Sequence, residues 1–175
     1  MMKSDLRLKS KTFATFRVSG DALLPDMITK TLKFQPTLSY RRGDQYSTAG
    51  SGTQFVGKTG VWFLSTERIV ASDKLADHLA FIFFVLGLTS NQRRFTMSEP
   101  AFVSDLNSQL RTVMDLQRLM KQAALKASLT CFWHGPVGAK PPTMPSTRLL
   151  EMASIEIETD FDVDTDAEED ATLVA

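Results

Sequence analysis

The feature of this sequence that most constrains its fold is an uninterrupted apolar run of ten residues, Leu79–Leu88. A helix that crosses a bilayer needs about 20 apolar residues, so this run predicts a helix buried inside a soluble domain. We expect that helix over 73–88, with Ser72 as its N-cap. Its apolar stripe, spaced three or four residues apart, consists of Leu75, Leu79, Ile82 and Leu86.

Segments with strand-like and helix-like periodicity alternate along the rest of the chain. Strands are expected over 12–19, 37–41, 61–64, 125–133 and 154–163. Further helices are expected from Pro25 to Pro36, over 100–124 and over 146–153, and loops over 42–58 and 89–98. This order predicts an α+β fold: an antiparallel or mixed sheet of four to five strands, with helices packed mainly on one face. We expect one domain over 1–163 and an acidic, disordered tail over 164–175.

The net charge of zero hides a separation along the chain. Residues 1–148 carry all 20 Lys and Arg residues, whereas residues 151–175 carry ten of the 20 acidic residues and no base. A basic body can bind nucleic acid, with the acidic end as a competing intramolecular ligand. The interpretation that we favour is a solvated surface, partly neutralised by the chain's own C-terminus.

The reactive side chains are few. A single cysteine, Cys131, allows no disulfide within the chain, and the N-terminus has no apolar leader, so we expect a cytoplasmic protein. Cys131 and His134 are three apart on an expected strand, where side chains face opposite ways, so no catalytic pair is predicted. We expect His78 to be a packed, hydrogen-bonded histidine. No catalytic residue, cofactor or metal is predicted.

One segment matches a phosphate-binding loop letter for letter. Gly52–Thr59 reads G-x-x-x-x-G-K-T, and in a true P-loop such a segment follows a buried strand and opens a helix. Here polar residues precede it, and the extended-looking Gly60–Leu64 follows. The context therefore argues against a phosphate site, and a nucleotide-binding enzyme stays as an alternative function.

The expected last strand alternates acidic and apolar residues. One face carries Glu156, Glu158, Asp160 and Asp162, and the other carries Ile155, Ile157, Phe161 and Val163. A calcium loop starting at Asp160 would need Gly and Glu where Thr165 and Ala171 stand, so calcium is not expected. The candidate interaction residues are these four acids together with Arg41, Arg42 and Trp62.

Seven short segments, taken in series, resemble a known family. They are Ala14–Asp21, Pro25–Ile28, Gln35–Thr37, Arg42–Asp44, Lys58–Trp62, Leu129–Trp133 and Ile157–Asp162. Over about residues 12–163 the chain resembles the bacterial domain-of-unknown-function family 4279. The resemblance implies a small α+β bacterial protein without an assigned activity, and it brings no catalytic residues. It also implies that Lys58–Trp62 leads into a strand.

The function expected from these observations is that of a non-enzymatic binding protein of the bacterial cytoplasm with a protein partner. An immunity-like role, in which an acidic surface masks a basic toxin, is one form of it. The alternatives are a nucleotide-binding enzyme that uses 52–59 and a nucleic-acid-binding protein that uses the basic body. No membrane partner is expected.

Overall fold

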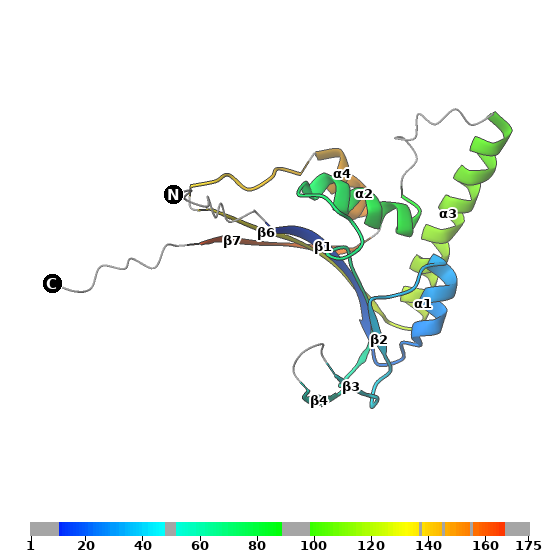
Figure 1. The fold of residues 1–175 in the computed structure, drawn as a ribbon. Helices are drawn as coiled ribbons and strands as arrows, with labels where there is room; N and C mark the ends of the chain where they lie inside the picture. The colour runs from blue at the N-terminus through cyan, green and yellow to red at the C-terminus, as the bar shows by residue number, and fades with distance from the viewer. Residues whose placement is uncertain are drawn as a thin grey trace.

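A computed structural model describes residues 11–47, 52–88, 99–136, 138–144, 146–154 and 156–166. The predicted α+β class is confirmed (Figure 1). The elements are β1 Lys11–Gly20, α1 Pro25–Leu32, β2 Leu38–Tyr40, β3 Gln45–Ser47, β4 Gln54–Val56, β5 Gly60–Ser65, α2 Leu75–Leu86, α3 Glu99–Gln122, β6 Lys126–Pro136, α4 Ser146–Ser154 and β7 Glu158–Asp166.

Five strands form one mixed sheet in the order β2-β5-β1-β6-β7, and β3 and β4 form a separate ribbon. The pairs β2–β5, β5–β1 and β1–β6 are antiparallel, whereas β6 and β7 are parallel. Parallel neighbours require a crossover connection, and α4 lies within the one that joins β6 to β7. The predicted mixed sheet of up to five strands is therefore confirmed.

The helices cover one face of this sheet, as predicted (Figure 1). Ala14, Phe16 and Val18 point from β1 into the core and are fully buried. The register places Phe16 between Leu64 of β5 and Leu129 of β6, which point the same way. The helix α2 packs against these strands with the predicted stripe of leucines and isoleucine, all of it buried. Residues at alternate strand positions face away from the helices.

The start of α2 differs from the prediction. The helix begins at Leu75, and its N-cap is Lys74, which makes no side-chain capping bond. Ser72 lies two residues earlier, where its hydroxyl accepts the N–H of Lys74 and donates to the Asp77 carboxylate. The Ser72 N-cap was therefore wrong, because this serine supports the turn before the helix instead.

The segment 42–58, predicted to be a loop, contains the β3–β4 ribbon. Tyr40 of β2 stacks on Tyr46 of β3 with ring centroids 4.2 Å apart, and Phe55 of β4 lies 5.6 Å beyond Tyr46. The aromatic stack holds two strands of only three residues, which are too short to show a periodicity in a sequence rich in glycine, serine and threonine. The predicted loop 89–98 lies outside the described residues.

The last strand begins later and ends later than predicted. Helix α4 runs to Ser154, Glu156 adopts a positive φ of 56°, and β7 covers Glu158–Asp166. Residues 164–166, expected in the tail, therefore belong to the strand, and residues 167–175 and Ile155 lie outside the described part. Ile157 is buried, but Phe161 and Val163 are each 48% exposed. The predicted apolar face is thus covered only at its start.

Candidate functional site

A row of carboxylates lies along β7, the last strand in the sheet order. This acidic row consists of Glu158, Asp160, Asp162 and Asp164, which stand in register with Ser128, Thr130, Phe132 and His134 of β6. Their side chains share the face away from the helices, because residues such as Leu129 and Cys131 fill the core from the alternate positions. Three of the four predicted acidic residues are therefore brought together here, and Asp164 is a member that the sequence assigned to the tail.

The acidic row is exposed and mostly unpaired. Asp164 lies 3.4 Å from His134 Nδ1, and within the described chain no ion pair joins Glu158, Asp160 or Asp162 to a base. Successive members stand about 7 Å apart, the repeat of same-face residues on a strand. Among the described residues no group of three or more potential ligands lies close enough together to hold a metal ion.

A stacked aromatic pair lies beside the acidic row on the same face. Phe13 of β1 and Phe132 of β6 are half-buried and stack with centroids 4.4 Å apart, and Phe132 is in register with Asp162. The Lys11 ammonium already lies 5.5 Å from the Phe13 ring centroid while it pairs with Glu67. This surface can therefore hold the aliphatic stem of a basic side chain while carboxylates bind its charged end.

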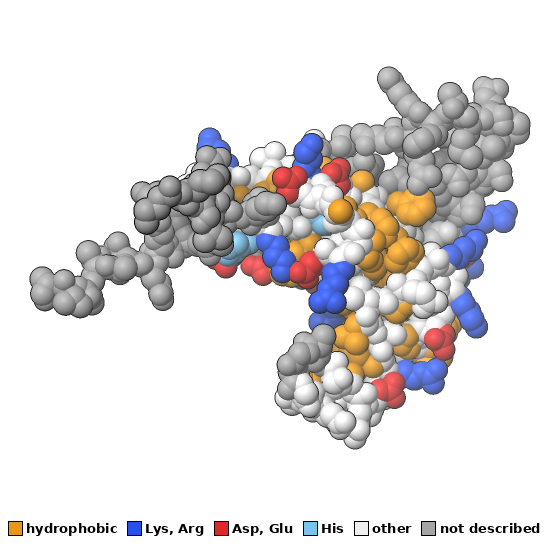
Figure 2. Space-filling model, viewed as in Figure 1, with side chains coloured by type: hydrophobic (Ala, Val, Ile, Leu, Met, Phe, Trp, Pro, Cys, Tyr) orange, Lys and Arg blue, Asp and Glu red, His pale blue; other side chains and the backbone are white. Residues whose placement is uncertain are grey.

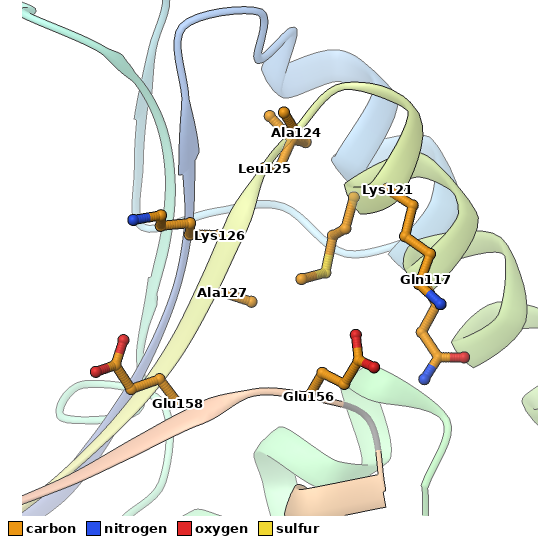
Figure 3. A pocket seen from close by; sticks show the side chains of 9 residues that line it. Gln117, Lys121, Ala124, Leu125, Lys126, Ala127, Glu156 and Glu158 are labelled. Carbon is orange, nitrogen blue, oxygen red and sulfur yellow. The ribbon is translucent and has the colours of Figure 1, made fainter.

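Glu156 precedes β7 and is not part of the acidic row, although Glu158, the first member of the row, lines the same cavity. It lines a cavity of about 390 Å³ between the end of α3, the start of β6 and the turn before β7. In Figure 3, Glu156 points toward the side that carries Gln117 and Lys121, whereas Glu158 extends away from them. Apolar residues, Leu125 among them, also line the cavity. The lining includes two acids, Glu156 and Glu158, two bases, Lys121 and Lys126, and the amide of Gln117. Such a lining suits a small polar molecule or one partner side chain.

Two residues lining this cavity have backbone angles that are unusual for non-glycine residues. Ala124 has φ of 49° and Glu156 has φ of 56°. Each follows a helix: the Ala124 N–H donates to the Lys121 carbonyl and the Leu125 N–H to the Met120 carbonyl, which is a Schellman motif. Glycine usually occupies this position. Because Glu156 and not glycine stands at this position after α4, the sequence did not indicate where α4 ends and β7 begins.

The predicted arginines are held by acids of the same chain. Arg42 Nη1 lies 2.8 Å from the Asp21 carboxylate, and Arg41 Nη2 lies 3.6 Å from that of Asp26. The Arg41 N–H also donates to the Asp44 carboxylate at 2.8 Å. These contacts tie the turn after β2 to the start of α1, at a distance along the sheet from the acidic row.

Trp62 is part of the core. Its side chain is fully buried, and its indole Nε1 donates to the Thr29 hydroxyl of α1 at 3.0 Å. The bond links the central sheet to the first helix, so Trp62 offers no surface to a partner.

The P-loop-like segment forms strand structure. Its residues occupy β4 and the connection to β5, and β5 begins at Gly60, directly after Thr59. No helix N-terminus follows the lysine, as a phosphate loop requires. Gly57 has a packing role instead: a Cβ there would lie 2.8 Å from the Tyr40 ring and 2.9 Å from the Arg41 carbonyl oxygen.

His78 is a packed, hydrogen-bonded histidine, as predicted. Its Nδ1 lies 2.7 Å from Thr66 Oγ1, and its Nε2 donates to the Ser72 carbonyl at 2.9 Å. Thr66 Oγ1 also accepts the Ala14 N–H at 2.9 Å. The network joins α2 to β1 beneath a surface groove, and no pattern in the sequence indicated the threonine partner.

Cys131 is buried on the helix side of β6, opposite to the face of His134, as expected. Burial raises the pKa of its thiol to about 12. A thiol in this state is protonated at neutral pH and is a poor nucleophile.

No helix among the described residues has both the length and the apolar character needed to cross a membrane.

A family model described as "Domain of unknown function (DUF4279)" matches residues 10–166. No curated protein and no solved structure matches the chain.

Proposed function

The chain belongs to the DUF4279 family, a domain of unknown function, and from this premise we propose that it is a non-enzymatic domain that binds a basic protein partner. The proposal places it in the bacterial cytoplasm. An immunity-like role, in which the domain masks a basic surface of a toxin, is one form of this function.

The observation that carries the proposal is the acidic row at the edge of the sheet. Three of its carboxylates form no ion pair with a base among the described residues, so an approaching basic side chain gains their attraction and relieves the repulsion between them. Charge complementarity of this kind steers a basic protein to one surface and disfavours acidic proteins there. The half-buried Phe13–Phe132 pair beside the row adds apolar area for the contact.

Two further observations support binding over catalysis or nucleic-acid recognition. The Cys131 thiol is held protonated by burial, and both nitrogens of His78 are engaged in the core network. Figure 2 shows Lys and Arg side chains spread over the visible face with acidic side chains between them. Arg17 and Lys126 also share their sheet face with the acidic row, which would repel a phosphate backbone.

The test is affinity capture with purified full-length protein, followed by mass spectrometry. A triple variant, Glu158→Gln with Asp160→Asn and Asp162→Asn, here termed the β7 variant, neutralises the three unpaired members of the row without changing side-chain size, and it leaves Asp164 in place. The control, Asp26→Asn with Asp73→Asn and Asp115→Asn, removes the same charge from exposed residues elsewhere.

We expect basic proteins that are retained by the wild type and the control to be lost from the β7 variant, with at least a tenfold fall in recovery. Each such protein is then purified and its Kd is measured. The proposal fails if the retained proteins are the same for both variants, or if those lost are not basic.

A further inference from the structure

We propose that the partner binds by strand addition: a segment with alternating basic and apolar residues pairs with the outer edge of β7. The inference rests on the proposed function and specifies how the basic partner is recognised.

The first step is the open edge. In the sheet order, β7 has β6 on one side, and among the described residues no strand pairs with its other side. Every second residue of an edge strand therefore presents its N–H and C=O groups outward, ready to pair with an added strand. With nine residues, β7 is longer than the other edge strand, β2, which has three. It can therefore accommodate a partner segment of at least five residues.

The second step is that the two faces of β7 carry different side chains, acidic on one face and apolar on the other. On the face away from the helices an added strand would meet Glu158, Asp160 and Asp162, whereas on the helix side it would meet Phe161 and Val163. Same-face neighbours on paired strands have Cβ atoms about 5 Å apart, so bases at alternate positions would each meet a carboxylate. The residues between those bases would cover the two half-exposed apolar side chains. The partner segment therefore alternates Lys or Arg with an apolar residue.

A second copy of this chain fits the edge poorly. Pairing β7 with β7 would place one acidic row against another, and like charges directly opposite each other destabilise a sheet. The chain does contain a short segment with the required alternation, Arg7-Leu8-Lys9, which precedes β1. A second copy of the chain and this N-terminal segment are the two competing occupants, and the experiment distinguishes both from a separate partner.

The experiment measures the Kd of synthetic, fluorescently labelled peptides for the full-length protein at about 150 mM salt. An alternating peptide with four lysines and three valines is compared with a block peptide of the same composition. We expect the alternating peptide to bind at least tenfold more tightly. The variant Asp160→Asn with Asp162→Asn should weaken it about tenfold, and Phe161→Ser with Val163→Ser should reduce the preference over the block peptide.

Backbone pairing is tested with two N-methylated forms of the alternating peptide, one methylated on the valines and one on the internal lysines. An added strand points only one of these two sets of N–H groups toward β7. We therefore expect one form to bind like the parent and the other to lose at least tenfold. Equal affinities for both forms would overturn strand addition.

The remaining outcomes separate this inference from the proposed function. If the block peptide binds as tightly as the alternating one, strand addition is wrong while binding of a basic partner stands. If neither peptide binds and the β7 variant retains the same proteins as the wild type, strand addition and the proposed function are both wrong.

The two competing occupants have their own signatures. If the variant Arg7→Ser with Lys9→Ser binds the alternating peptide more tightly than the wild type does, the edge is assigned to the chain's own segment. A dimer by analytical ultracentrifugation that the alternating peptide dissociates would assign it to a second copy. Either result overturns the proposal.

Discussion

At the scale of single residues, α2 and α3 both end in a Schellman motif, and the two motifs differ in the residue that takes the left-handed conformation. Helix α2 ends with Gly87 at φ of 74°, whereas α3 ends with Ala124 at φ of 49° in the equivalent position. A left-handed conformation costs an alanine about 1 kcal/mol more than a glycine, because its Cβ approaches the neighbouring carbonyl.

We therefore expect Ala124→Gly to raise the free energy of unfolding by roughly 0.5–1 kcal/mol, since the relief of strain exceeds the entropy lost by glycine. Gly87→Ala should lower it by about 1 kcal/mol. Urea denaturation followed by circular dichroism measures both. A destabilised Ala124→Gly variant would contradict the assignment of strain to this residue.

Cys131 makes stability depend on pH in a defined window. Its pKa is about 12 in the folded protein, against about 9 in the unfolded chain. Below about pH 8 the thiol is protonated in both states and contributes no pH dependence. Above pH 9 the unfolded chain releases the proton and the folded protein keeps it, so stability falls toward pH 12 by up to about 1.4 kcal/mol per unit.

The measurement is the free energy of unfolding of the wild type and Cys131→Ala between pH 8 and pH 11. Tyrosine and lysine titrate equally in both proteins, so the difference between them isolates the thiol. That difference should be constant below about pH 8 and should shift in favour of the alanine variant as the pH rises through 9. Parallel curves throughout would show that the thiol is accessible to solvent.

At the scale of elements, long periodic segments were predicted well and short or atypically terminated ones were not. The stripe of α2 and the alternation of β6 each bury one complete face, so their periodicity appears directly in the sequence. The β3–β4 ribbon depends on aromatic stacking between Tyr40, Tyr46 and Phe55, which no local pattern reveals. The start of β7 was missed because Glu156 stands where a glycine would have marked the end of α4.

The same reasoning applies to the candidate site. The acidic alternation at Glu158, Asp160 and Asp162 was visible in the sequence, because the period of two is intrinsic to a strand. The position of this acidic row at an open edge of the sheet was not visible in the sequence, because strand order is set by contacts between distant segments. Trp62 was selected by residue type alone, and only the bond to Thr29 shows that it belongs to the core.

The P-loop-like segment yields a prediction at this scale. Because Lys58 lies between two strands, no cradle of helix N–H groups surrounds a phosphate there. Isothermal titration calorimetry with about 1 mM ATP and magnesium should therefore give no binding heat with the wild type or with Lys58→Ala. Binding heat that Lys58→Ala removes would restore the nucleotide-binding alternative.

At the scale of the whole molecule, part of the acidic segment at the end of the sequence belongs to the sheet and not to a free tail. The acidic row is held in β7 beside β6, so four of the ten acidic residues of 151–175 belong to the sheet face. Removal of the tail should therefore leave the acidic surface of the domain in place.

We predict that a chain truncated after Asp166 binds random-sequence DNA and RNA no better than the full-length protein, even at about 20 mM salt. The acidic row that remains would still repel phosphates from the face that carries Arg17 and Lys126. Electrophoretic mobility shift assays test this prediction. A marked gain in affinity that falls steeply with salt would favour the nucleic-acid alternative, with the tail as a competing ligand.

The central position of β1 has a consequence for how the chain folds as it is synthesised. Both neighbours of this strand, β5 and β6, come later in the sequence, and the partners Lys11 and His134 are more than 100 residues apart. Pairing between such distant segments is slow, and an unpaired strand exposes backbone groups and apolar side chains meanwhile. During synthesis β1 therefore leaves the ribosome before both of its partner strands, and its pairing with β6 must wait until residue 136 has emerged. Nascent chains of this protein should depend on chaperones until β6 is available to complete the sheet around β1.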